Sequence, residues 1–269
     1  MSPLVIPLGL VIGLALGALG GGGSILTVPA LVYVLGQEPR AATTSSLLIV
    51  GVTSLIALLP HARAHHVRVG QGLMFGALGT GGSFLGSLLA SRVAPQVLLS
   101  AFAGLMLVVA TLMLRRSFRR SPGPGDTDPT SEPILTLRPL TCACPRLAKV
   151  VVTATGVGLL TGFFGVGGGF VLVPALVLAL SFPMPVAVGT SLLVIAVNSA
   201  TALTARISTV GADLDWPLIG GFTAAAVAGS LVGGRLTSRI HPTILTRTFA
   251  ALLVVVALYT AARALPGLF

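Results

Sequence analysis

The chain has 269 residues, of which 54% are hydrophobic and only 8% are charged, and its formal net charge is +10. Soluble domains carry about 25% charged residues, so this composition excludes an ordinary soluble protein and indicates one that crosses a membrane several times. The positive charge does not indicate a nucleic-acid partner, because seven of the 16 basic residues gather in or beside one hydrophilic segment in the middle of the chain.

The apolar stretches follow one another along the whole chain. A helix of about 20 residues crosses a bilayer, and unbroken apolar runs without alternation favour helices over barrel strands. We expect long helices at 4–20, 44–60, 70–91, 96–114, 149–165, 189–205, 216–235 and 243–262, and shorter ones at 24–36 and 169–181. The predicted fold is therefore an all-α polytopic membrane protein.

A run of four glycines lies inside the first apolar region, in the sequence LGGGGSILTVPAL. A chain break at membrane depth is tolerated only where protein or a water-filled cavity covers it. In inverted-repeat transporters, such half-helix N-termini direct backbone N–H groups at an anionic substrate. We therefore predict substrate-binding residues at the run and directly after it, and a helix break at the proline that follows. These are Gly20, Gly21, Gly22, Gly23 and Ser24, with Pro29 as the break.

The next helix is expected to begin at a hydroxyl-rich stretch, ATTSSLL at 42–48. Ser and Thr cap helix N-termini, and their hydroxyl groups could replace the hydration of an oxyanion. The candidate binding residues here are Thr44, Ser45, Ser46 and Thr53. His61 is expected near the end of the same helix, where it could act as a gate or, more commonly, extend towards the interface as an anchor.

The hydrophilic segment at 117–147 is predicted to be a flexible cytoplasmic linker between two membrane units at 1–116 and 148–269. It contains SPGPGDTDPTSEP, a composition that cannot bury a core. Basic residues flank this sequence, as is typical of loops on the cytoplasmic side.

The two membrane units repeat each other. GALGGGGSILTVPALV, starting at Gly17, aligns with GFFGVGGGFVLVPALV, starting at Gly162, and ATTSSLL aligns with AVGTSLL at the same offset of 145 residues. GSFLGSLLASRVAP and GSLVGGRLTSRIHP align at an offset of 147. Each half is therefore one copy of a unit. The second copy adds Gly165, Gly167, Gly168, Gly169, Thr190, Ser191 and Asn198 as binding candidates, Pro174 as a helix break and Arg206 as the partner gate of His61.

The number of segments in each copy decides its orientation, since five would invert the second copy in the membrane and four would not. Five segments place the basic loops on the side of the linker and the acidic loops on the other side. The linker side receives Arg63, Arg68, Arg235, Arg239 and Arg247. The opposite side receives Arg40 with Glu38, Arg92 alone, and Arg206 with Asp213 and Asp215. The positive-inside rule therefore favours an inverted 5+5 arrangement with the N-terminus outside.

Small residues also allow membrane helices to pack closely, and we prefer this explanation for GALGTGGSFLGS and AAAVAGSLVGG. All six acidic residues map to loops or the linker, which fits an anionic cargo and leaves a buried proton relay without a carboxylate. The chain contains no H-E-x-x-H, G-x-S-x-G or Walker A sequence. We therefore expect neither an enzyme nor a metal or other cofactor.

The duplicated blocks GGGGSILTVPAL and GVGGGFVLVPAL, each followed by ATTSSLL or AVGTSLL, resemble the sulfite exporter TauE/SafE family over nearly the whole chain except the linker. This resemblance implies transport of a small anion, such as sulfite or an organosulfonate, across the cytoplasmic membrane, commonly outward. The sequences around Thr44 and Gly189 differ between the copies, so the half-sites could contribute unequally.

The sequence thus predicts a secondary transporter in which the two repeats rock about a central anion site. An anion channel and a non-transporting membrane partner protein are the alternatives. The expected partners are the anion and the lipid bilayer, and the sequence also allows a second copy of the chain.

Overall fold

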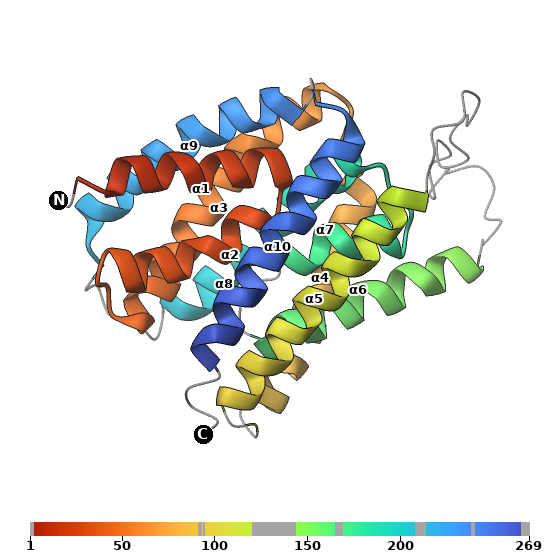
Figure 1. Cartoon of the computed structure of the whole chain (residues 1–269), viewed down its shortest axis with the longest axis horizontal. Helices are drawn as coiled ribbons and strands as arrows, with labels where there is room; N and C mark the ends of the chain where they lie inside the picture. Colours follow the sequence, from red (N-terminus) through yellow and green to blue (C-terminus); the bar gives the residue numbers. More distant parts are fainter. Residues whose placement is uncertain are drawn as a thin grey trace.

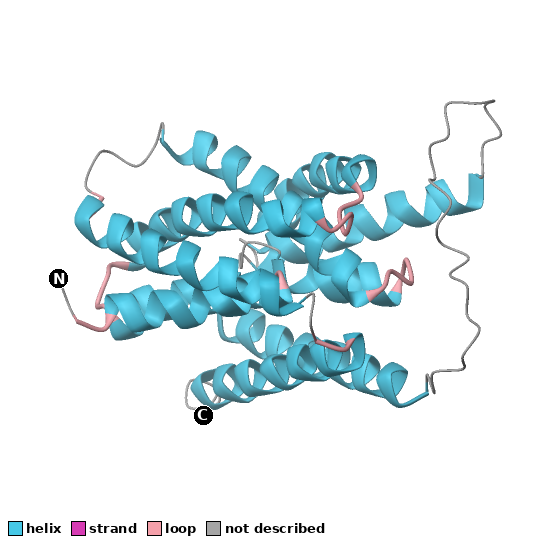
Figure 2. Ribbon diagram, turned by 90° about the horizontal axis from the view of Figure 1, so that it is seen from above, coloured by secondary structure: helices cyan, strands magenta, loops and turns pink. Residues whose placement is uncertain are grey.

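The structure, a computed structural model, describes residues 3–90, 93, 95–119, 144–164, 169–207, 214–237 and 240–264. All regular secondary structure within these ranges is helical (Figures 1 and 2). The elements are α1 (Val5–Leu19), α2 (Gly22–Pro29), the π-helix η1 (Ala30–Val34), α3 (Pro39–Arg63), α4 (Val69–Ala90), α5 (Pro95–Arg119), α6 (Cys144–Phe164), α7 (Gly169–Leu178), α8 (Met184–Ile207), α9 (Trp216–Thr237) and α10 (Pro242–Ala264).

The predicted all-α membrane fold is confirmed. Every predicted apolar segment is helical, and α3, α5, α8, α9 and α10 each contain a stretch long and apolar enough to cross a membrane. Helical structure extends into both ends of the predicted linker, because α5 continues to Arg119 and α6 begins at Cys144. The remainder of that linker, 120–143, lies outside the described residues.

The predicted starts of two helices are wrong. The hydroxyl-rich stretches at 43–46 and 189–191 do not cap α3 and α8, because these helices begin earlier, at Pro39 and Met184. Proline is favoured in the first turn of a helix, where its missing N–H leaves no hydrogen bond unmade. The hydroxyl groups consequently lie inside α3 and α8, and not at their ends.

The two prolines expected to break the short helices behave differently. Pro29 ends α2, and the chain continues as the π-helix η1. Pro174, in contrast, lies inside α7, which continues to Leu178, so this predicted break is wrong. Proline removes one backbone hydrogen bond, and α7 tolerates this because it is embedded in the core.

Glycines join each copy to the other at two equivalent interfaces. In the first, α1 packs against α9, and a Cβ on Gly17 would lie 2.1 Å from the backbone oxygen of Ser230. In the second, α6 packs against α4, and a Cβ on Gly162 would lie 1.9 Å from the backbone oxygen of Ser83. These contacts correspond at the sequence offsets of 145 and 147. The expectation that the glycine-rich faces of α4 and α9 serve close packing is correct.

The helix directions follow from these contacts. On α1, Gly9 lies near Phe222 and Gly17 lies near Ser230, so α1 and α9 run parallel. The contacts of α4 with α6 advance in the same way, from Gly79 with Gly158 to Ser83 with Gly162.

The equivalent helices α3 and α8 pack against each other at the centre of the bundle. The segment that follows α3 contacts the first part of α8, where the Arg68 N–H donates to Thr190 Oγ1 at 3.2 Å. The two helices therefore run in opposite directions. An inverted repeat requires this arrangement.

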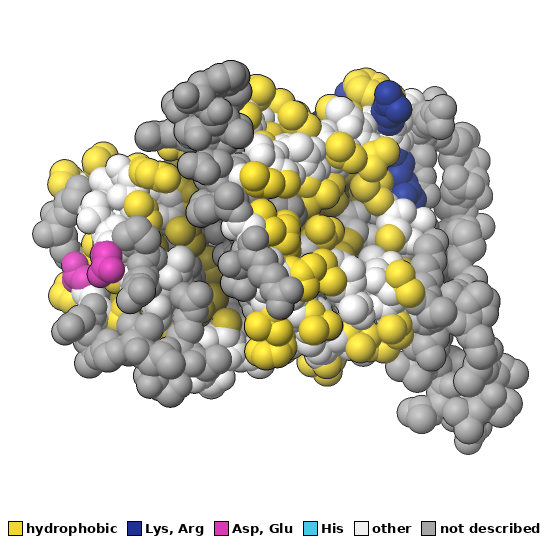
Figure 3. All heavy atoms as spheres, turned by 90° about the horizontal axis from the view of Figure 1, so that it is seen from below, with side chains coloured by type: hydrophobic (Ala, Val, Ile, Leu, Met, Phe, Trp, Pro, Cys, Tyr) yellow, Lys and Arg dark blue, Asp and Glu magenta, His cyan; other side chains and the backbone are white. Residues whose placement is uncertain are grey.

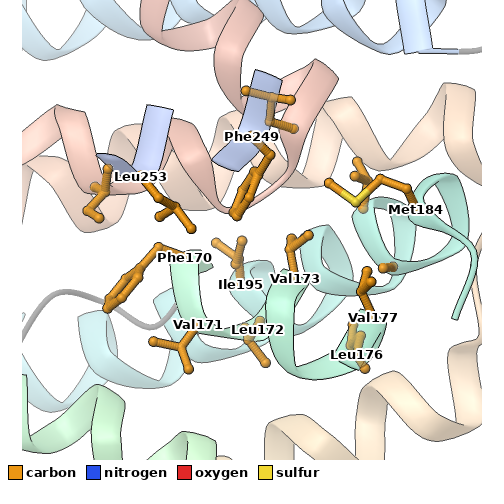
Figure 4. Packing of buried hydrophobic residues seen from close by; sticks show 14 of the residues in the cluster. Phe170, Val171, Leu172, Val173, Leu176, Val177, Met184, Ile195, Phe249 and Leu253 are labelled. Carbon is orange, nitrogen blue, oxygen red and sulfur yellow. The ribbon is translucent and has the colours of Figure 1, made fainter. Parts of the chain in front are cut away.

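The short helix α7 is surrounded by apolar side chains (Figure 4). Its Phe170 ring meets the Phe102 ring of α5 edge to face, with 5.0 Å between the ring centroids. Phe249 and Leu253 of α10 and Ile195 of α8 complete the cluster. A broken helix is thus held inside the protein, where lipid does not reach its ends.

On the face that Figure 3 shows, many apolar side chains lie between an acidic group at one end and basic groups at the other. Glu38 and Asp215 directly precede α3 and α9, and Arg63 and Arg235 lie at the other ends of these helices. The Asp215 carboxylate accepts a hydrogen bond from the Leu218 N–H at 3.1 Å, as an N-terminal cap does.

Candidate functional site

The first glycine run ends α1 through a backbone conformation that favours glycine. Gly20 has φ 70° and ψ −106°, and its N–H donates to the Leu16 oxygen at 2.8 Å. A Cβ at this position would lie 2.5 Å from Ser191 Oγ of the second copy. Both the positive φ and the close approach of α8 require glycine here.

The starts of α2 and α7 meet each other near the middle of the bundle (Figure 1). A Cβ on Gly21 would lie 1.6 Å from the Gly169 oxygen, and one on Gly169 would lie 2.4 Å from Ser24 Oγ. The structure therefore brings the predicted half-sites together, but the backbones of Gly21 and Gly169 are in direct contact. Gly165, Gly167 and Gly168 lie outside the described residues.

Four of the predicted polar residues are engaged within the protein. The Ser24, Ser46 and Ser191 hydroxyl groups each donate to a backbone oxygen three residues earlier, at 2.8 Å. Thr190 Oγ1 accepts the hydrogen bond from Arg68 described above. Their bonds help to shape the helix breaks and the contact between α3 and α8.

Other buried polar atoms on α3 and α8 have no hydrogen-bond partner. They are Ser45 Oγ, Thr53 Oγ1, Ser54 Oγ and Asn198 Oδ1. An unpaired buried polar group costs about 1–3 kcal/mol, and membrane proteins as a rule satisfy such groups. Ser54 follows Thr53 in the sequence, and the same reasoning from hydroxyl groups applies to both residues.

These unpartnered atoms are spread along the two helices that cross at the centre of the bundle. Asn198 follows Ile195 by one helical turn, and a Cβ on Gly169 would lie 2.9 Å from Ile195 Cδ1. The Asn198 Oδ1 atom itself faces α4, because a Cβ on Gly76 would lie 3.9 Å from it. The structure therefore places unpaired side-chain polar groups along α3 and α8, with Asn198 one turn beyond the contact of α8 with the start of α7. Within the described ranges, no group of three or more His, Cys, Asp or Glu residues could hold a metal ion.

Side chains from α3 and α9 cap the broken end of α1. The Nε2–H group of His61 donates to the Gly17 oxygen at 3.1 Å. The Thr237 hydroxyl group shares its proton between the Ala18 oxygen at 3.1 Å and the Gly233 oxygen of its own helix at 3.0 Å. The Gly17 and Ala18 oxygens belong to carbonyl groups that the end of α1 would otherwise leave without partners. His61 is only 2% exposed, so the expectation of an extended anchor is wrong for this residue. The side chain of Arg206 lies outside the described part of the chain.

Thr237→Val is expected to destabilise the protein by about 1–3 kcal/mol, because valine has the shape of threonine but leaves the buried Ala18 oxygen without its partner. The thermal unfolding temperature in detergent measures the effect. Thr111→Val is the matched control, since Thr111 is exposed and donates only to oxygens of its own helix. Equal unfolding temperatures for the two variants would contradict the capping role.

A cavity of about 400 Å³ opens where α3 and α9 end, and sequence reasoning did not predict it. His61, Arg63, His66 and Arg235 contribute to its lining. The charge pattern had placed Arg63 and Arg235 on one side of the membrane, but it contained no signal that the two arginines border a common space.

In the described part of the chain, all regular structure is helical and five helices are long and apolar enough to cross a membrane, which are the features of a multi-pass membrane protein. The family model described as sulfite exporter TauE/SafE matches residues 5–260. The chain belongs to this family of membrane transporters.

Its relatives carry names of the same kind. A probable membrane transporter protein of Xylella fastidiosa (strain Temecula1) is 36% identical over 255 residues, which cover 92% of this chain and 90% of the relative. The probable membrane transporter protein YunE of Bacillus subtilis is 28% identical, over 94% of this chain and 93% of its own length. MJ0441 of Methanocaldococcus jannaschii, also a probable membrane transporter protein, is 24% identical over 76% of this chain and 71% of its own. No solved structure matches the chain significantly.

Proposed function

We propose that the protein exports a small anion, such as sulfite or an organosulfonate, by alternating access through a site that α3, α4 and α8 form beside the two helix breaks. The observation that carries this proposal is the set of buried side-chain oxygens without partners: those of Ser45, Thr53, Ser54 and Asn198. Hydroxyl groups can donate to an oxyanion, and the amide of Asn198 can do so after it rotates.

The conformation with Gly21 against Gly169 is, in this proposal, the closed form of the site. Opening separates the two breaks, so that the N–H groups at the starts of α2 and α7 reach the anion together with the hydroxyl groups. A backbone contact between glycines suits such a movement, because it contains no interlocking side chains.

The moving bodies in this mechanism combine helices of both copies. Since α1 packs against α9 and α4 against α6, the rocking units are α1 and α9 with α3, and α4 and α6 with α8. Each unit contains helices that run in one direction. The two units correspond helix by helix, because α1, α3 and α9 of one unit are the repeat equivalents of α6, α8 and α4 of the other, as an inverted repeat requires.

The proposed orientation places the N-terminus outside the cell membrane and the central linker in the cytoplasm. Glu38 and Asp215 then face outward, and Arg63 and Arg235 lie at the cytoplasmic end, in agreement with the positive-inside rule. An anion leaving the cell would first meet this basic end.

Thr53→Val and Asn198→Leu are expected to lower the uptake of radiolabelled sulfite into proteoliposomes at least tenfold, because each removes a hydrogen bond to a charged ligand worth about 1.5–3 kcal/mol. Neither variant should lower the unfolding temperature, since each removes a polar group that has no partner in the protein. The two measurements together separate binding from folding.

Thr201→Val is the matched control. Thr201 is exposed on α8, and its hydroxyl group donates only to the Val197 and Asn198 oxygens of the same helix. Transport at the wild-type rate by Thr53→Val and Asn198→Leu would exclude the proposed site. A carrier should also show faster uptake when unlabelled sulfite is present on the opposite side, whereas a channel should not.

A further inference from the structure

We propose that the cavity at the ends of α3 and α9 is a second anion site, in which the cargo binds before it reaches the helix breaks. This inference rests on the proposed function and extends it to the entry path. The cavity of about 400 Å³ lies in the lower part of the usual range for small-molecule sites, about 300–1,000 Å³. It can therefore hold an organic anion, or an inorganic one with bound water.

The lining of the cavity grades from a buried floor to a basic rim. His61 and Gly234 are buried and Pro60 is half-buried, whereas Arg63 and Arg235 are exposed. His66 is half-buried, and its ring centroid lies 6.5 Å from that of His61. Arginine side chains at the rim can attract an oxyanion and bind it through two parallel hydrogen bonds.

The charges around the cavity favour an anion. Among the described residues no acidic side chain lines it, and Glu38 and Asp215 lie at the opposite ends of α3 and α9, roughly 35 Å away by helix length. The C-terminal ends of these two helices contribute about half a negative charge each. The two arginines exceed this contribution, so the described residues give the cavity a net positive potential.

The floor of the cavity is connected to the helix break by one side chain. His61 lines the cavity, and its Nε2–H group donates to the oxygen of Gly17, three residues before the turn at Gly20. The loop that carries His66 is fixed to the second copy as well, since a Cβ on Gly189 would lie 2.5 Å from the His66 oxygen. An anion in this cavity therefore contacts elements that hold both copies at the proposed central site.

The test measures sulfite uptake against sulfite concentration in vesicles of phosphatidylcholine. The double variant Arg63→Gln/Arg235→Gln is expected to raise KM about tenfold and to keep the maximal rate within a factor of two, because the site loads the cargo and does not move it. Arg115→Gln is the control, since Arg115 lies exposed at the same end of the molecule but does not line the cavity. The single variants Arg63→Gln and Arg235→Gln should each raise KM more than this control, and equal KM values would overturn the proposal.

A second variant fills the cavity without changing any charge. A Cβ on Gly234 would lie 3.0 Å from Pro60 Cγ and 3.7 Å from His61 Nε2, so the side chain in Gly234→Leu enters the cavity and should also raise KM. Gly220→Leu on the same helix is its control, because a Cβ on Gly220 meets nothing within 4 Å. Wild-type KM in Gly234→Leu would contradict the proposal.

Two further arms identify the ligand and separate this proposal from the transport function. If the arginine variants raise KM only in vesicles that contain phosphatidylglycerol, the cavity binds a lipid headgroup, and the cargo assignment is overturned. In neutral detergent, sulfite should raise the unfolding temperature of the wild type more than that of the double variant. If this holds while the wild type transports no sulfite, the anion site in the cavity is supported and the proposed transport of sulfite is contradicted. If every variant transports sulfite with an unchanged KM, the transport function is supported and the anion site is contradicted.

Discussion

Gly162→Ala is expected to lower the free energy of unfolding by about 3 kcal/mol or more, because its Cβ would lie 1.9 Å from the Ser83 oxygen and force α4 and α6 apart. The clash is with backbone, so no side chain can rotate to relieve it. For a chain of this size, such a loss corresponds to a fall of roughly 10 °C in unfolding temperature.

The control lies in the same helix. Gly156 is exposed on α6, and a Cβ there meets nothing within 4 Å. Gly156→Ala should leave the unfolding temperature unchanged or raise it, since alanine favours a helix by about 1 kcal/mol over glycine. Gly17→Ala, at the equivalent contact with Ser230, should behave like Gly162→Ala. A similar unfolding temperature for Gly156→Ala and Gly162→Ala would show that this interface is not closely packed.

Gly20→Ala is expected to abolish the proposed sulfite transport and to destabilise the protein, for two separable reasons. The first is its φ of 70°, which costs a residue with a side chain about 1–3 kcal/mol. The second is the approach of Ser191 Oγ to 2.5 Å from the new Cβ. Transport rate and unfolding temperature are measured on the same preparations.

Gly36→Ala separates the two reasons, because Gly36 also has a positive φ, of 69°, but a Cβ there meets nothing within 4 Å. Its loss of stability reports the backbone strain alone. The additional loss in Gly20→Ala reports the contact with α8, and Ser191→Ala should recover part of it by removing the Oγ atom. If Gly20→Ala behaves like Gly36→Ala and transports sulfite normally, the turn has no role beyond its conformation.

The sequence was sufficient to predict the helices and the break after α1, because hydrophobicity and glycine act locally. The apolar runs located every helix, and the run from Gly20 to Gly23 located the interruption of the first one. The repeat in the sequence also indicated that a second interruption would lie before Gly169. The contact between Gly169 and Gly21 could not be derived from the sequence, since neither glycine has a side chain whose polarity or size would indicate its neighbour.

The wrong predictions for α3, α8 and His61 arose because these features depend on contacts that the local sequence does not show. The starts of α3 and α8 were placed too late because Ser and Thr are common caps, whereas Pro39 and Met184 in fact begin these helices. His61 was expected at the surface because a polar ring near a helix end usually reaches water. Its burial depends on a carbonyl group that is free only because α1 breaks after Leu19, which is a tertiary effect.

The pairing of α1 with α9 has a consequence for synthesis and membrane insertion. Nearly 200 residues separate the end of α1 from the start of its partner, and at about 5–20 residues per second the ribosome needs roughly 10–40 s to make them. During this interval the glycine face of α1 has only lipid, a temporary neighbour or the insertion machinery against it. Newly made chains should therefore be most vulnerable to proteolysis until α9 emerges, and a stop codon before Trp216 should yield a fragment that is degraded instead of a stable half-protein.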